Sequence, residues 1–167
     1  MRMRIGYGYD SHRFALPKDS DGGAAKPLVL GGVEFPREPG LVAHSDGDAL
    51  AHAIIDALLG AAAMGDIGAL FPDTDPKWSG ADSMKMLEAV AKKIRAGGYA
   101  IGNIDATVIC ERPSIRGAAE MIRERLAGAM SIGKGRISVK GKTNEGMDDI
   151  GAGLGVAVHA VCLLEER

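Results

Sequence analysis

The stretch from His44 to His52, with the sequence His-Ser-Asp-Gly-Asp-Ala-Leu-Ala-His, opens an apolar helical run and decides the fold around it. A carboxylate at Asp46 or Asp48 can cap that helix, because it accepts backbone N–H groups that have no partner inside the helix. Asp48, His52 and Asp56 recur every four residues, so they share one face of the helix. This polar stripe on an apolar helix is either a solvated face or part of a site.

The length and composition predict one globular domain over residues 1–167. The chain is 46% hydrophobic and 25% charged, with a net charge of −2 and no basic block, which argues against a nucleic-acid partner. No run approaches the ~20 apolar residues of a membrane helix, and polar residues interrupt any signal peptide near the first methionine. Cys110 and Cys162 lie in apolar runs, as buried thiols of a reducing compartment do. We therefore expect a cytoplasmic protein without a membrane partner.

Hydrophobic periodicity and turn residues predict the secondary structure. Strands are expected at Arg4–Tyr9, Ile104–Cys110, Ile137–Lys140 and Leu154–Leu164, with a hairpin at Leu28–Phe35 that turns at Gly31-Gly32. Helices are expected at about Asp46–Met64, Asp82–Ala96 and Ser114–Met130, and loops at Asp19–Lys26, Leu70–Gly80 and Gly141–Gly155. Strands alternate with helices but include a hairpin. The predicted fold is therefore an α/β (α+β) two-layer sandwich, a mixed β-sheet with helices on one face plus the small hairpin.

One carboxylate and two imidazoles form the first candidate site. Residues i and i+2 of an extended chain point to the same side, so Asp10 and His12 converge at the end of the first strand. Together with His52 from the helix they suit a catalytic zinc ion with one open position. The alternative is that these side chains serve as caps or core hydrogen bonds. His159, alone in an apolar strand, is interpreted as structural.

Two further segments have a functional and a structural interpretation. His44 and Ser45 precede the central helix, whose N–H groups and dipole favour anions, so they indicate either phosphate binding or a simple loop with a cap. Asp66, Asp73 and Asp75 flank the following loop. These carboxylates can hold a hydroxylated substrate or a hard cation, but aspartate is also common in turns for conformational reasons.

The segment Lys140–Glu145 resembles a phosphate-binding turn. It places Lys, Thr and Asn donors beside Gly141, and Glu145 can hold a divalent cation on the phosphates. It is not a Walker A loop, because no upstream glycine has the required spacing.

Taken together, these segments resemble the 2-C-methyl-D-erythritol 2,4-cyclodiphosphate synthase family of the non-mevalonate isoprenoid pathway over nearly the whole chain. The resemblance rests on Arg4–His12, Gly31-Gly32, Ala43–Asp48, His52, Asp56–Gly68, Phe71–Asp75 and Lys142–Glu145. It departs at Ser114, where many members have lysine. It also departs at Asp149 and Ala152, which replace a frequent aromatic and a frequent arginine of the central cavity of the family's trimer.

The resemblance implies a homotrimer with active sites between neighbouring subunits. It implies a phosphorus-oxygen lyase that converts 4-diphosphocytidyl-2-C-methyl-D-erythritol 2-phosphate to the cyclic diphosphate and CMP. It places Zn²⁺ on Asp10, His12 and His52, and a second divalent cation, Mg²⁺ or Mn²⁺, near Glu145 and the diphosphate. His44 and Thr143 are implied to stabilise the transition state. The implied substrate-binding residues are Asp10, Ser11, His12, His44, Ser45, Asp66, Ile67, Gly68, Phe71, Pro72, Asp73, Thr74, Asp75, Cys110, Pro113, Ser114, Ile115, Arg116, Lys142, Thr143, Asn144 and Glu145.

The physical chemistry of that reaction fits the sequence. Nucleophile and electrophile lie in one substrate, so no nucleophilic side chain is needed, and divalent cations let an acidic chain bind a polyanion. Two alternatives remain: a zinc phosphohydrolase that yields a linear phosphate, and a nucleotide-binding trimer without turnover, motivated by the changed residues 149–152. We further expect Asp48 and Asp56 to orient the His52 imidazole by hydrogen bonding.

Overall fold

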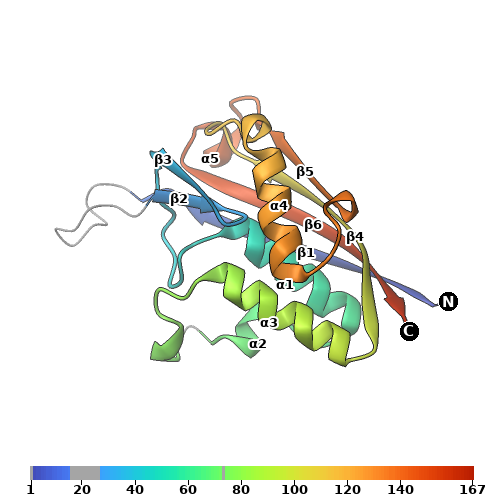
Figure 1. The fold of residues 1–167 in the computed structure, drawn as a ribbon. Helices are drawn as coiled ribbons and strands as arrows, with labels where there is room; N and C mark the ends of the chain where they lie inside the picture. The colour runs from blue at the N-terminus through green and yellow to red at the C-terminus, as the bar shows by residue number, and fades with distance from the viewer. Residues whose placement is uncertain (1, 16–26, 73) are drawn as a thin grey trace.

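A four-stranded mixed sheet in the order β1-β6-β4-β5 organises the computed structural model, which describes residues 2–15, 27–72 and 74–167 (Figure 1). The strands are β1 (Met3–Arg13), β4 (Tyr99–Ile109), β5 (Ile137–Lys142) and β6 (Gly155–Glu166). β6 runs antiparallel to both β1 and β4, and β4 runs parallel to β5. The carboxyl ends of β1, β4 and β5 therefore meet at one end of the sheet, where the candidate site residues lie.

Three long helices cover one face of this sheet (Figure 1). α1 (Ala49–Ala62) packs on β1 and β6, α3 (Ser83–Ala96) packs beside α1, and α4 (Ala119–Met130) packs on β5. β2 (Pro27–Leu30) and β3 (Val33–Pro39) form the separate hairpin. The short elements are α2 (Ile67–Leu70), η2 (Pro76–Trp78), η3 (Ile115–Gly117), η4 (Lys134–Arg136) and α5 (Asp148–Gly151). The predicted α/β class with a mixed sheet, helices and a hairpin is confirmed.

Two glycines let α1 approach β1 closely. Gly6 and Gly8 face the helix. A Cβ atom on Gly6 would lie 1.9 Å from the carbonyl oxygen of Ala57, and one on Gly8 would lie 1.9 Å from that of Ala53. Any larger residue would push the helix away from the strand. His52 precedes Ala53 and Asp10 follows Gly8 by two residues on the same side of β1. The close approach of the helix therefore brings His52 to Asp10.

α1 is buried on nearly all sides, and its partly exposed positions include His52 and Asp56 of the predicted polar stripe. Asp48 is the N-cap and is fully buried. Its carboxylate accepts the N–H groups of Gly31 and Gly32 at 2.8 and 2.7 Å, so it binds the hairpin turn to the helix. Asp56 accepts the Ile67 N–H at 2.8 Å instead. The hydrogen bonds of both carboxylates go to backbone amides, so the expectation that they orient His52 was wrong.

Several predicted boundaries differ from the structure because tertiary pairing sets them. β1 continues past Tyr9 to Arg13, since β6 pairs with its whole length, and Asp10 and His12 thus lie within the strand. The third predicted helix starts as the separate turn η3. The loops predicted at 70–80 and 141–155 contain η2 and α5. The predicted loop at Asp19–Lys26 lies outside the described residues. No helix in the described part of the chain is long and apolar enough to cross a bilayer.

Candidate active site

The three predicted metal ligands meet between β1 and α1. Oδ2 of Asp10 lies 3.0 Å from Nε2 of His12 and 3.0 Å from Nδ1 of His52. One ligand atom from each of the three residues lies within 4.8 Å of the others, and all three side chains are partly buried. One carboxylate and two imidazoles directed at one point form a ligand set that suits zinc with an open position.

The hydrogen bonds of His12 test whether this cluster fits a metal ion. Its Nδ1 lies 3.0 Å from the carbonyl oxygen of Val42, so Nδ1 carries the proton and donates it to that oxygen. Nε2 is left with its lone pair. It is buried without an acceptable hydrogen bond, even though the Asp10 oxygen is only 3.0 Å away. A buried, unpartnered nitrogen that faces a carboxylate and a second imidazole is the arrangement that a zinc ligand needs.

The electrostatics keep Asp10 in its ligating, ionised form. Burial alone would raise the pKa of Asp10, but the neighbouring imidazoles of His12 and His52 outweigh it and hold that pKa below its usual range. The carboxylate beside His12 raises the pKa of this imidazole, against a smaller opposing effect of burial. Asp10 is therefore ionised at neutral pH and supplies a negative charge to the site.

The residues before α1 lie beside the cluster. The hydroxyl of Ser45 lies 3.3 Å from Nε2 of His52 and accepts the Gly47 N–H at 3.2 Å. His44 is exposed, and its carbonyl oxygen accepts the Gly80 N–H at 2.9 Å, which connects the segment before α1 to the loop before α3. The structure thus places Ser45 next to the ligands and leaves the His44 imidazole accessible.

Turn and cap hydrogen bonds account for the described aspartates after α1. Asp66 caps α2 through the Ala69 N–H at 2.8 Å, and Asp75 caps η2 through the Lys77 N–H at 3.1 Å. The other predicted residues of this segment, Ile67, Gly68, Pro72 and Thr74, lie between these two caps. The Phe71 ring packs edge-on against Trp78. Asp73 lies outside the described residues.

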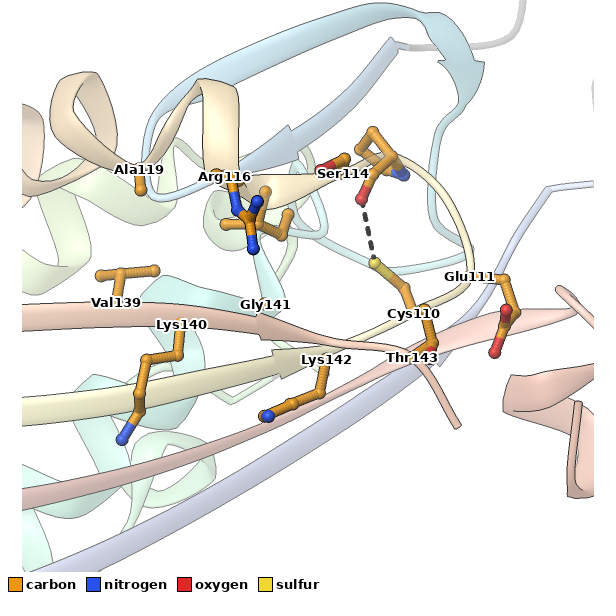
Figure 2. Close-up of a pocket in the computed structure, with 12 residues that line it drawn as sticks. Cys110, Glu111, Ser114, Arg116, Ala119, Val139, Lys140, Gly141, Lys142 and Thr143 are labelled. Carbon is orange, nitrogen blue, oxygen red and sulfur yellow. Dashed lines mark hydrogen bonds between the residues drawn. The ribbon is translucent and has the colours of Figure 1, made fainter. Parts of the chain in front are cut away.

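A second cluster forms a cavity of about 520 Å³ between η3 and the end of β5 (Figure 2). Figure 2 shows Arg116 extending toward β5, while Lys140 and Lys142 project from the opposite side of that strand. The predicted residues that line the cavity are Cys110, Pro113, Ser114, Ile115, Arg116, Lys142 and Thr143. Sequence reasoning missed Ala119 and Val139, which also line it, because neither side chain has a polar group to signal a site.

The polar turn after β5 is held in place from two sides. The carboxylate of Glu111 accepts the Asn144 N–H at 2.9 Å, and the Thr143 hydroxyl donates to Glu145 at 2.9 Å. Glu111 follows Cys110 directly, but its hydrogen bond to Asn144 was not predicted from the sequence. Burial raises the pKa of the Cys110 thiol to about 11, so this sulfur stays protonated and is no nucleophile.

The metal cluster and the cavity lie at the same end of the sheet but at opposite edges. Asp10 pairs with Val158, Val158 with Val108, and Val108 with Gly141, so Asp10 and Gly141 share one row across four strands. Three strand spacings separate them by roughly 14 Å, at ~4.8 Å per spacing. The two halves of the predicted site are therefore both present in one chain, but they are not brought together within it.

Comparison with known proteins gives consistent matches over nearly the whole chain. Residues 3–165 match the model of the YgbB family. A 2-C-methyl-D-erythritol 2,4-cyclodiphosphate synthase of Trichlorobacter lovleyi is 53% identical over 162 residues, which are 97% of this chain and 98% of the relative. One of Salinibacter ruber is 47% identical, covering 98% of this chain and 99% of the relative.

Solved structures agree with these relatives. The structure described as IspF of Plasmodium falciparum in complex with CDP matches with a TM-score of 0.84 and 34% identity, over 99% of this chain and 97% of that one. The bifunctional IspDF of Campylobacter jejuni matches with a TM-score of 0.90 and 38% identity, over 99% of this chain and 43% of that one.

Proposed function

The chain belongs to the YgbB family and has 2-C-methyl-D-erythritol 2,4-cyclodiphosphate synthase activity, and on that basis we propose how its residues divide the reaction. It is a phosphorus-oxygen lyase of the non-mevalonate pathway, and it closes 4-diphosphocytidyl-2-C-methyl-D-erythritol 2-phosphate into the cyclic diphosphate with release of CMP. The observation that carries the proposal is the convergence of Asp10, His12 and His52 on one point in a chain of this family.

We assign Zn²⁺ to Asp10, His12 and His52. The unpartnered Nε2 of His12 and the ionised carboxylate of Asp10 support this assignment. Zinc bound here would supply positive charge to phosphate oxygens of the substrate. The exposed imidazole of His44 lies on the segment that also carries Ser45, next to the metal ligands. We assign to His44 the stabilisation of the transition state, and to Ser45, Ser11, 66–68 and 71–75 the binding of the phosphate and erythritol groups.

We assign the cavity between η3 and β5 to the cytidine diphosphate part of the substrate. Its residues Cys110 and Pro113–Arg116 combine apolar walls with the cationic side chain of Arg116, which suits a base and a diphosphate, and Lys142 also lines the cavity. The Thr143 hydroxyl would donate a hydrogen bond to the β-phosphate, where negative charge builds up during the attack. Asn144 belongs to the same turn after β5. Glu145, held beside Thr143, would bind the second divalent cation, Mg²⁺ or Mn²⁺.

We infer that residues 1–167 form a single cyclodiphosphate synthase domain that acts as a homotrimer. The metal cluster of one subunit would face the cavity of its neighbour, which joins the two halves that lie at opposite edges of the sheet in each chain. Two free, buried cysteines support a cytoplasmic location, where thiols stay reduced.

In this scheme the protein holds the two reacting groups of the substrate together and neutralises their negative charge. An oxygen of the 2-phosphate attacks the β-phosphorus, and the bond from that phosphorus to the oxygen bridging to the α-phosphate breaks, so CMP leaves with that oxygen. Both reacting groups belong to one bound molecule, which makes the attack intramolecular. The protonated thiol of Cys110 takes no covalent part in this scheme.

The test is to incubate the purified protein with the cytidyl substrate and Mg²⁺ and to follow both products. We expect CMP in the supernatant and a cyclic diphosphate by phosphorus NMR, with neither formed by His52→Ala. A linear phosphate would instead favour a zinc phosphohydrolase. Tight CMP binding without CMP release would favour a binding protein that lacks turnover.

A further inference from the structure

We propose that Ser83 and Asp46 form a positioning pair that sets which nitrogen of His52 carries its proton and thereby directs the other nitrogen at the metal. The proposal rests on the zinc site proposed above. The side chain of Ser83, the first residue of α3, is fully buried and lies against His52. Its Oγ is 2.8 Å from Nε2 of His52, whereas the nitrogen that faces Asp10 is Nδ1.

The direction of these hydrogen bonds follows from counting hydrogens. The carboxylate of Asp46 only accepts, and Oδ1 takes the hydroxyl hydrogen of Ser83 in a short contact. Once that hydrogen is used, Oγ of Ser83 has only lone pairs to offer to His52. Nε2 must then be the protonated nitrogen that donates to Oγ. A neutral imidazole has one N–H, so Nδ1 keeps its lone pair for a cation. Without a cation, the ionised carboxylate of Asp10, 3.0 Å away, competes for a proton on Nδ1.

Backbone contacts hold this pair rigid. Oδ2 of Asp46 accepts the Ser83 N–H at 3.0 Å, and Oδ1 accepts the Asp48 N–H at 3.2 Å. The Asp46 N–H in turn donates to the Ala81 carbonyl at 3.1 Å. Asp46 is thus fixed to the entrance of α1 on one side and to the start of α3 on the other. The N-terminus of α3 is therefore connected to the metal site through the Ser83 side chain.

Ser83→Ala tests the proposal, because it removes the acceptor of the His52 proton with little change in volume. The only other hydroxyl near Nε2 in the described residues is that of Ser45, at a longer 3.3 Å. We expect zinc affinity, measured by competition with a chelator, to fall about 10- to 100-fold. In the metal-free protein at about pH 8, nitrogen NMR should show that the fraction of His52 protonated on Nε2 falls, because Asp10 then draws the proton to Nδ1.

Asp82→Ala is the matched control. Asp82 caps the same helix through the N–H groups of Met84 and Lys85, so loss of its carboxylate weakens the start of α3 without touching His52. We expect Asp82→Ala to lower thermal stability and leave the zinc affinity and the tautomer unchanged. An equal loss of zinc affinity in both variants would show that Ser83 only supports the helix, and would overturn the proposal.

A double-mutant cycle with Asp46→Asn tests whether Asp46 and Ser83 act on zinc binding together or independently. Asparagine has one oxygen for the three hydrogens that Asp46 accepts, so Ser83 is less firmly held as an acceptor. We expect Asp46→Asn to weaken zinc binding when Ser83 is present and to add little in the Ser83→Ala background. Additive losses would contradict the pair. Absence of zinc binding in the wild-type protein would instead contradict the proposed metal site, and the metal-free tautomer measurement would still test the pair.

Discussion

The hydroxyl oxygen of Tyr7 lies 2.9 Å from Nδ1 of His159, which joins β1 to β6 on the face of the sheet opposite α1. Tyr9 also packs on this imidazole, with 5.0 Å between ring centroids. His159 therefore has specific partners among the tyrosines of β1, where the sequence pattern made it look isolated. Around it Ile5 is 75% exposed, Tyr7 58% and Val161 45%, and these exposed apolar side chains support the use of this face as the interface of the proposed trimer.

Ile5→Asp should therefore disrupt the proposed trimer. A buried, unpaired carboxylate at an apolar interface is strongly unfavourable, so we expect light scattering to give the mass of a monomer and catalytic activity to be lost. Zinc content should persist, because all three ligands belong to one chain. Met121→Asp is the control, since Met121 is 53% exposed but lies on α4. A trimer that survives Ile5→Asp would show that copies associate through another surface.

Subunits with complementary defects should restore activity when they are mixed. His52→Ala damages the metal cluster, which is one half of the proposed site, and Thr143→Val damages the cavity, which is the other half. In each chain the metal half lies at the β1 edge of the sheet and the cavity half at the β5 edge. In randomly mixed trimers an intact metal half faces an intact cavity half at about one interface in four, so we expect about a quarter of wild-type activity. Activity that stays absent in verified hybrid trimers would place both halves of each site in one chain.

Asp10→Asn should remove most zinc binding, because Asp10 is the one anionic ligand in the cluster. The amide keeps the shape of the side chain but loses the charge that attracts the cation. We expect metal analysis after dialysis to show a loss of affinity of more than about 100-fold. Asp105→Asn, which changes a carboxylate of β4 paired with Lys140, should keep its zinc. Unchanged zinc content in Asp10→Asn would remove Asp10 from the ligand set.

The order of elements was predictable from the sequence because it depends on local periodicity, whereas the contact of His52 with Asp10 depends on the tertiary approach of α1 to β1. Alternation along a strand places Asp10 and His12 on one side, and the helical repeat of α1 was visible from its apolar positions. The stripe of Asp48, His52 and Asp56 was also predictable, but the hydrogen-bond partners of its two carboxylates were not. Their partners are amides of the hairpin turn and of α2, which only the tertiary arrangement brings to α1.

Ser83 shows why the remainder of the site could not be predicted. A serine after an aspartate at a helix start is a common capping pattern, and nothing in residues 82–85 indicates that α3 packs beside α1 with its first residue against His52. Glu111 is similar, because its contact with Asn144 depends on the parallel pairing of β4 and β5. Residues that act by supporting another side chain carry no signal of their own in one sequence.

Cys110 should resist alkylation in the folded protein, even though it lines the cavity. Burial raises the pKa of this thiol from 9.0 to about 11. At about pH 8 that change lowers the thiolate fraction about 100-fold, and the rate should rise as the pH is raised toward the higher pKa. Mass spectrometry after iodoacetamide treatment measures the rate, with the urea-unfolded protein as control. Equal rates in the folded and unfolded protein would contradict a buried, protonated thiol.

Gly8→Ala should disturb the fold and the metal site together. The added Cβ would lie 1.9 Å from the carbonyl oxygen of Ala53 and 2.7 Å from the backbone nitrogen of Ala57, so no side-chain rotation relieves the clash. α1 must move away from β1, which separates His52 from Asp10. Overpacking of this kind costs about 1–3 kcal/mol or more of unfolding free energy. We therefore expect a lower urea midpoint and a lower zinc affinity.

Gly128→Ala is the matched control, because the same methyl group meets nothing within 4 Å on α4. Alanine is favoured over glycine inside a helix by about 1 kcal/mol, so this variant should be more stable than the wild type and should bind zinc equally well. The two substitutions add the same atoms but are expected to act with opposite sign on stability. If Gly8→Ala kept wild-type stability and zinc affinity, the position of His52 would not depend on close contact between α1 and β1, and another element would have to hold the ligand in place.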